Sequence, residues 1–261
     1  MNSNDLYQNS RRAVGISGGR ALCPTARKVG YKMEMKRLTE HIYYYPHQPE
    51  TDRPMLAYVK GEKIALVIDA GASAHHVDEF YAALDVAGLR KPNLTAITHW
   101  HWDHTFGMHR IHGLSIAGAK TSELLCREKE RLSESGYEAF LKRDDECLAK
   151  EYAGGQSIVA TPSAIQFEDR LVLNLGGMTA QLFETAAPHS EDTTLIYIPE
   201  EKALFLGDAT SEDFYNNGYM DKSKLKSLIH IIEEIDCNYC VLSHTEPLSK
   251  TELLGYLDSV L

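Results

Sequence analysis

The stretch His99-Trp100-His101-Trp102-Asp103-His104 places three imidazoles and one carboxylate within six positions. Side chains of these types are costly to bury together, because each loses hydration and those of like charge repel once ionised. A divalent metal ion removes both costs, since neutral imidazole and carboxylate are among its natural ligands. A histidine-rich surface loop is the structural alternative, and the residues further along the chain argue against it.

The run that precedes this stretch, residues 94–98, is apolar and β-branched and predicts a buried strand. If the backbone stays extended, His99 and His101 point to the same side, because side chains two positions apart share a face. Asp103 and His104 can then reach a neighbouring position as the chain turns away. One short loop is therefore expected to supply two ligands to each of two adjacent metal ions.

Three further candidate ligands follow apolar, strand-like runs: His189, Asp208 and His244. With them the pattern resembles the metallo-β-lactamase superfamily, whose signature is H-x-H-x-D-H, then a distant His, an Asp and a last His. All seven positions have a matching residue here, and the resemblance covers about residues 35–261. It implies an α/β fold, a four-layer αβ/βα sandwich built from two similar halves.

The resemblance also implies the chemistry of the site. It assigns His99, His101 and His189 to a first metal ion, Asp103, His104 and His244 to a second, and Asp208 to a bridge between them. Asp103 is also expected to be catalytic. Two divalent ions, zinc first with manganese or iron as alternatives, would share a hydroxide that attacks a small ester, thioester or lactone.

Two positions narrow the branch of the superfamily. Zinc β-lactamases that use a cysteine ligand carry it where this chain has Asp208, and they place a carboxylate-binding lysine where this chain has Ser211. A β-lactam substrate is therefore disfavoured, although a β-lactamase or a phosphodiesterase stays an alternative. The persulfide dioxygenase branch shares the motif but uses one iron. A mononuclear iron oxidoreductase acting on a sulfur compound is thus the second hypothesis.

An internal repeat points to one more residue. Glu62-Lys63, four apolar residues, one further position and Asp69-Ala70 align without a gap on the segment from Glu201 to Ala209. A duplicated half of a β-sheet protein would leave such a trace. On that interpretation Asp69 lies near the site and braces the metal loop, whereas the alternative is an ordinary turn residue at the end of a strand.

Composition limits the partners of the chain. Of its 27 basic and 37 acidic residues, six basic residues and one acidic residue lie in residues 1–32, which leaves a net charge of −15 on the rest. Because nucleic-acid-binding proteins present a basic face, nucleic acid is not expected as a partner, and a small-molecule substrate is. No apolar run approaches the roughly 20 residues of a transmembrane helix. The five cysteines, an odd number, favour a reducing compartment, the cytoplasm, with Cys237 and Cys240 as buried free thiols.

The chain is expected to form one domain over residues 33–261, preceded by a disordered extension over residues 1–32. Residues 119–152 are highly charged, with apolar residues at helical intervals, and predict one or two amphipathic helices inserted into the domain. Core packing, a lid over the site and a homodimer surface are the alternatives for this insertion. A helix is expected from the N-cap Ser73 to Ala87, with His75 and His76 on its surface. Other strands are expected over residues 38–45, 55–59, 63–68, 171–175, 178–184, 194–198, 203–206 and 239–243, and other helices over 222–235 and 251–260.

Overall fold

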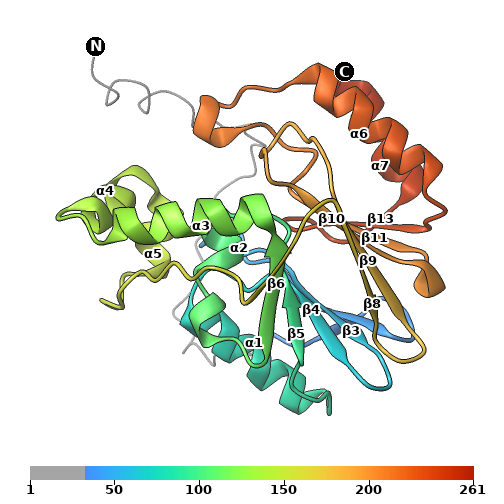
Figure 1. Ribbon diagram of the computed structural model, residues 1–261, viewed down its shortest axis with the longest axis horizontal. Helices are drawn as coiled ribbons and strands as arrows, with labels where there is room; N and C mark the ends of the chain where they lie inside the picture. Colours follow the sequence, from blue (N-terminus) through green and yellow to red (C-terminus); the bar gives the residue numbers. More distant parts are fainter. Residues whose placement is uncertain (1–32) are drawn as a thin grey trace, which may run out of the picture.

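The computed structural model describes residues 33–261, so the predicted extension over residues 1–32 lies outside the described part. Two β-sheets pack face to face, and helices cover the outer face of each sheet (Figure 1). The four-layer α/β sandwich predicted from the sequence is confirmed.

The first sheet contains seven strands in their order along the chain. Its first four strands pair antiparallel, and β4, β5, β6 and β7 pair parallel. Because the carboxyl ends of parallel strands meet at one edge of a sheet, Asp69, just after β4, lies beside the residues that follow β5. The strands are β1 Lys36–Arg37, β2 Ile42–Tyr45, β3 Leu56–Lys60, β4 Ala65–Ile68, β5 Leu94–Ala96, β6 Leu114–Gly118 and β7 Ile165–Phe167.

The second sheet contains six strands in the order β13-β12-β11-β10-β9-β8. Strand β11 pairs antiparallel with β10 and parallel with β12, as β4 does with β3 and β5. Asp69 and Asp208 therefore follow equivalent strands of the two sheets, which agrees with the internal repeat in the sequence. The strands are β8 Arg170–Asn174, β9 Thr179–Glu184, β10 Thr194–Ile198, β11 Ala203–Gly207, β12 Tyr239–Leu242 and β13 Leu248–Ser249.

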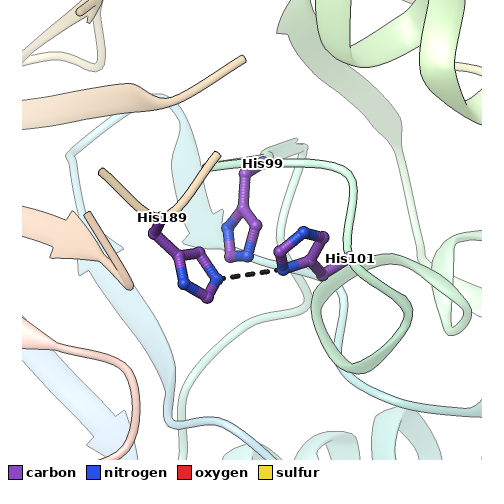
Figure 2. Close-up of side chains that lie close together, drawn as sticks. All are labelled: His99, His101 and His189. Carbon is purple, nitrogen blue, oxygen red and sulfur yellow. Dashed lines mark hydrogen bonds between the residues drawn. The ribbon is translucent and has the colours of Figure 1, made fainter. Parts of the chain in front are cut away.

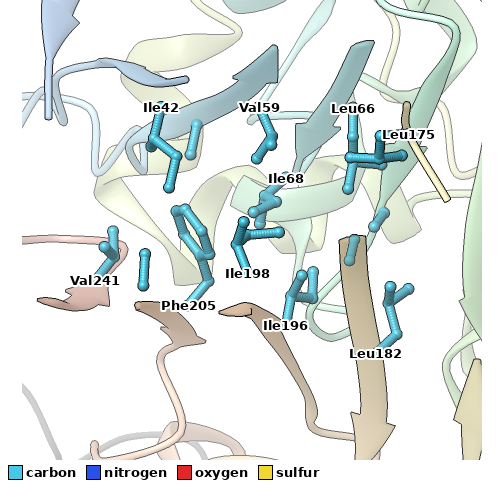
Figure 3. Packing of buried hydrophobic residues seen from close by; sticks show 14 of the residues in the cluster. Ile42, Val59, Leu66, Ile68, Leu175, Leu182, Ile196, Ile198, Phe205 and Val241 are labelled. Carbon is cyan, nitrogen blue, oxygen red and sulfur yellow. The ribbon is translucent and has the colours of Figure 1, made fainter. Parts of the chain in front are cut away.

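The main core fills the space between the two sheets (Figure 3). Alternate side chains of β3 and β4 point into it, among them Val59, Leu66 and Ile68, and meet Ile196, Ile198, Phe205 and other residues of the second sheet. Burial of this apolar area, worth roughly 25 cal/mol per Å², fixes the strand ends whose loops carry the candidate ligands.

Helix α1 (Ala74–Val86) covers the outer face of the first sheet. It begins as predicted at Ser73, whose hydroxyl accepts a hydrogen bond from the His76 backbone N–H at 3.1 Å. It is followed by Gly88 in the left-handed region, a conformation that glycine adopts at little cost. Phe80 and Leu84 pack on the outward side chains of β3 and β4.

The predicted surface position of His76 was wrong. His75 is exposed, but His76 is fully buried, with its ring centroid 6.1 Å from that of Tyr45. Its Nδ1 accepts a hydrogen bond from the Ala72 N–H at 3.3 Å. This contact with the preceding turn gives the imidazole a buried partner, and helical periodicity alone does not reveal it.

Helices α6 (Lys222–Glu234) and α7 (Lys250–Val260) cover the second sheet (Figure 1). Leu225 and Leu253 pack with Leu204 of β11. Cys237 and Cys240 lie in the same cluster with their sulfurs 3.9 Å apart, so the prediction of buried free thiols is confirmed. Within residues 33–261, none of the helices combines the length and the apolar character that a membrane crossing requires.

The insertion forms three helices where one or two were predicted: α3 Ala119–Leu132, α4 Tyr137–Asp144 and α5 Glu146–Glu151. Gly136, with φ +87°, separates the first two, and Asp145 caps α5 by accepting from the backbone of Cys147 and Leu148. The α5 end packs against the site: Leu148 and Tyr152 share a buried cluster with Trp102. Core packing therefore accounts for this part of the insertion.

Candidate metal centre

A change of chain direction splits the stretch 99–104 into two pairs of candidate ligands. The extended segment after β5 is fixed by the Thr98 carbonyl, which accepts from the Thr194 N–H at 2.7 Å. Directly after His101 the chain forms a single helical turn, α2 (Trp102–Thr105), which the sequence did not predict. This turn directs Asp103 and His104 away from His99 and His101 and toward Asp208 and His244. The helical turn thus separates the four candidate ligands of the stretch into two pairs.

The first group consists of His99, His101 and His189, three buried imidazoles that point toward one another (Figure 2). The His189 Nε2 lies 2.9 Å from the His101 Nδ1. Its other nitrogen, Nδ1, donates to the Glu212 carbonyl at 2.7 Å, which leaves Nε2 of a neutral ring free to bind a metal. The His99 Nε2 is buried, and it has no hydrogen-bond partner among residues 33–261. Burial of such a donor or acceptor without a partner is costly, and a cation between the rings removes that cost.

The second group consists of Asp103, His104, Asp208 and His244. The His244 Nε2 lies 3.2 Å from one carboxylate oxygen of Asp103 and 3.2 Å from one of Asp208. The His104 Nε2 is 3.1 Å from the same Asp103 oxygen and 3.4 Å from a carboxylate oxygen of Asp208. Asp208 also lies 3.7 Å from the His189 Nε2, so its carboxylate touches both groups.

The protonation preferences of these residues suit a metal cation. Burial, with the neighbouring imidazoles, holds the pKa of His99 and His101 well below the usual range, so both rings are neutral at pH 7. Burial alone would raise the pKa of Asp208, but His244 and His104 lower it, and the carboxylate is ionised. The carboxylates of Asp103 and Asp208 in turn raise the pKa of His104 and His244, against the effect of burial. A divalent cation would displace those protons, and the residues present therefore fit one.

Asp69 braces the metal loop as the internal repeat suggested. One of its carboxylate oxygens accepts from the Thr98 N–H at 2.8 Å, and the other lies 2.8 Å from the His104 Nδ1. The second contact fixes the His104 ring with Nδ1–H toward Asp69 and Nε2 toward Asp103 and Asp208.

Replacement of Asp69 by asparagine is expected to weaken metal binding about 10- to 100-fold, because it keeps an acceptor for Nδ1–H but removes the charge behind the ligand. Competition with a chromogenic chelator measures this affinity. Asp78→Asn, which changes an exposed carboxylate paired with Arg110, is the control. Equal affinities for Asp69→Asn and the wild type would refute the bracing role.

Two carboxylates near the site were not predicted. Asp192 is buried, accepts from the Ser190 hydroxyl at 2.5 Å and from the Trp100 backbone, and so joins the His189 loop to the 99–104 loop. Asp52 lies 3.5 Å from the His244 Nδ1, on the side of that ring away from Asp103. Asp192 could have been found from the sequence, because it lies three residues after the candidate ligand His189. No local pattern marks Asp52.

A model of the metallo-beta-lactamase superfamily matches residues 55–233. The chain belongs to this superfamily. The match contains six of the seven candidate ligands, and the structure brings the seventh, His244, to the same place as the others. A comparison with curated proteins finds no significant match.

Solved structures with this superfamily fold are similar to most of the chain. A metallo-beta-lactamase from Pontibacter korlensis is 16% identical with a TM-score of 0.62, over 86% of this chain and 98% of that one. The DIM-1 metallo-beta-lactamase is 16% identical with a TM-score of 0.60, over 87% of this chain and 96% of that one. A double mutant of the sec-alkyl sulfatase PisA1 is 15% identical with a TM-score of 0.64, over 87% of this chain but 40% of that one. At these identities the likeness extends to the fold alone.

Proposed function

We propose that this superfamily member is a dinuclear metal-dependent hydrolase that cleaves a small ester, thioester or lactone. The observation that carries the proposal is the pair of donor groups, three imidazoles on one side and Asp103, His104 and His244 on the other, with the Asp208 carboxylate touching both. Divalent ions held by these residues, with zinc as the first candidate, would lower the pKa of water and polarise the oxygen of the bond under attack.

The chain's own residues prepare this chemistry by fixing ring orientation. The Glu212 carbonyl holds His189, and Asp69 holds His104, each through Nδ1. Both rings therefore present Nε2 to the interior of the site without rearrangement. Asp103 and Asp208 supply two negative charges that balance bound cations, and Asp103, the predicted catalytic residue, also faces His244.

The arrangement of the second group favours two metal ions over one. His104 and His244 both direct Nε2 at the same two carboxylates. A mononuclear iron centre would leave the buried imidazole of His104 and the partly buried imidazole of His244 without a role. We propose that the enzyme works in a reducing compartment, such as the cytoplasm, since Cys126, Cys237 and Cys240 are free thiols.

Chelation is expected to abolish hydrolysis of a panel of aryl esters, thioesters and lactones, because no donor group on this site attacks the substrate by itself. Dialysis against a chelator and readdition of Zn²⁺ or Mn²⁺ should remove and then restore turnover. Persistence of full turnover after the chelator has removed all bound metal would contradict the proposal.

A further inference from the structure

Exposed aromatic side chains gather in the loop that follows Asp208. Phe214 and Tyr215 lie in a short 3₁₀ helix, η3 (Phe214–Asn216), and Tyr219 follows it. Their exposed fractions are 58%, 41% and 58%. Exposed apolar side chains that cluster on a protein surface often mark a binding site.

Two of these rings contact the candidate ligands. The Phe214 ring centroid lies 5.6 Å from that of His189 in an edge-to-face arrangement. The Tyr215 ring lies 4.7 Å from His101 and 5.0 Å from Trp100. These are ordinary distances for aromatic pairs. Trp100, Phe214 and Tyr215 thus form an aromatic shelf at the edge of the metal centre, with Phe214 and Tyr215 still partly open to solvent.

The loop is held in shape by its own hydrogen bonds. The Asp213 carboxylate accepts from the Asn216 N–H at 3.0 Å, and the Asp213 N–H donates to the Tyr219 carbonyl at 3.0 Å. Asn217 and Gly218, both in the left-handed region, close the turn. A shelf fixed in this way loses little conformational freedom when a ligand binds.

The charges beside the shelf are acidic. Glu212 and Asp213 precede it in the loop, and Asp52 lies across the second group beside His244. The basic side chain that reaches the His189 loop, Lys120, is paired with Glu123 and Glu191. An anionic substituent next to the shelf would meet repulsion from these carboxylates.

We infer that the aromatic shelf binds an uncharged aromatic group of the substrate, next to the bond that the metal centre cleaves. This inference rests on the proposed hydrolase function, which gives the position of the cleaved bond. The rings of Phe214 and Tyr215 offer stacking and edge-to-face contacts to an aromatic group, which an alkyl chain of the same length cannot use fully.

Binding is tested on the metal-loaded protein with amides that are not hydrolysed. N-methyl-4-phenylbutanamide, its ring-sulfonated derivative and N-methyl octanamide, whose chain is of similar length, are titrated by calorimetry. The phenyl amide is expected to bind about three- to tenfold more tightly than either of the others. In Phe214→Ala/Tyr215→Ala this preference should vanish. Tyr219→Ala, which removes an equally exposed ring of the same loop without a ring contact to the described residues, should retain it.

Turnover is measured in parallel with the S-ethyl thioesters of the same two uncharged acyl groups, which share one leaving group. Selective binding without turnover would leave the shelf in place and overturn the hydrolase. Turnover together with equal binding of the phenyl amide and the octanamide would support the hydrolase and overturn the shelf. Absence of measurable binding of the phenyl amide, or preference retained in the double variant with an intact metal content, overturns the inference.

Discussion

Substitution of His101 by alanine is expected to lower hydrolysis of an activated thioester by more than about 100-fold and to remove at least one of two bound metal ions. Its imidazole is buried, and its Nδ1 lies 2.9 Å from the His189 Nε2. Loss of a residue that only orients a ligand weakens a site about 10- to 100-fold, and loss of the ligand itself should exceed that. Without the ring, His99 and His189 would face a cavity that water can enter.

Turnover and metal content of His101→Ala are measured on the same preparation, with circular dichroism to show that the fold is retained. His230→Ala is the matched control, since it removes an exposed imidazole on α6. It should behave like the wild type. Full metal content and turnover in His101→Ala would show that the first group does not form a working site.

Substitution of Glu151 by glutamine is expected to lower the free energy of unfolding by about 3 kcal/mol, the scale for breaking a buried ion pair. The Arg53 guanidinium donates to both carboxylate oxygens of Glu151, at 2.7 Å and 2.9 Å, and both side chains are buried. The same carboxylate accepts from the Ser73 hydroxyl at the start of α1. Loss of its charge would leave buried Arg53, within residues 33–261, with the half-exposed Glu79 as its ionised partner and the Gln48 side-chain oxygen as a neutral one.

Urea unfolding of Glu151→Gln measures this change. Lys142→Ala, which breaks the partly exposed pair with Glu138, is the control and should cost less than about 1 kcal/mol. Because Arg53 follows Asp52, the residue beside His244, the variant should also bind metal less tightly. A stability equal to that of the Lys142→Ala control would show that this network does not tie the insertion to the domain.

The stretch 99–104 determined most of what could be predicted about the site. Its three histidines and one aspartate can be recognised as candidate metal ligands from their chemistry, without knowledge of the fold. The apolar runs before His189, Asp208 and His244 indicate that these residues follow strands. Local sequence does not show how the chain turns at Trp102. It could not reveal Asp52 either, because that residue reaches His244 only through tertiary packing.

Strands with clear apolar patterns were predicted close to their true ends, as for β10, Thr194–Ile198. Strand β6 (Leu114–Gly118) was missed because its sequence, LSIAG, contains small residues and one β-branched side chain, and it is defined by parallel pairing with β5. Helix α5 was not predicted as a separate helix because its N-cap, Asp145, lies within a run of charged residues and does not stand out as a helix start. Asp145 ends one helix and begins the next.

The metal content of the purified protein tests the central claim most directly. After dialysis against metal-free buffer, mass spectrometry of the wild-type chain should find about two divalent ions per molecule, and fewer in His101→Ala. A chain that retains one iron and no other metal, together with oxygen consumption on a sulfur substrate, would contradict the account, as would a chain that binds no divalent ion when zinc is supplied.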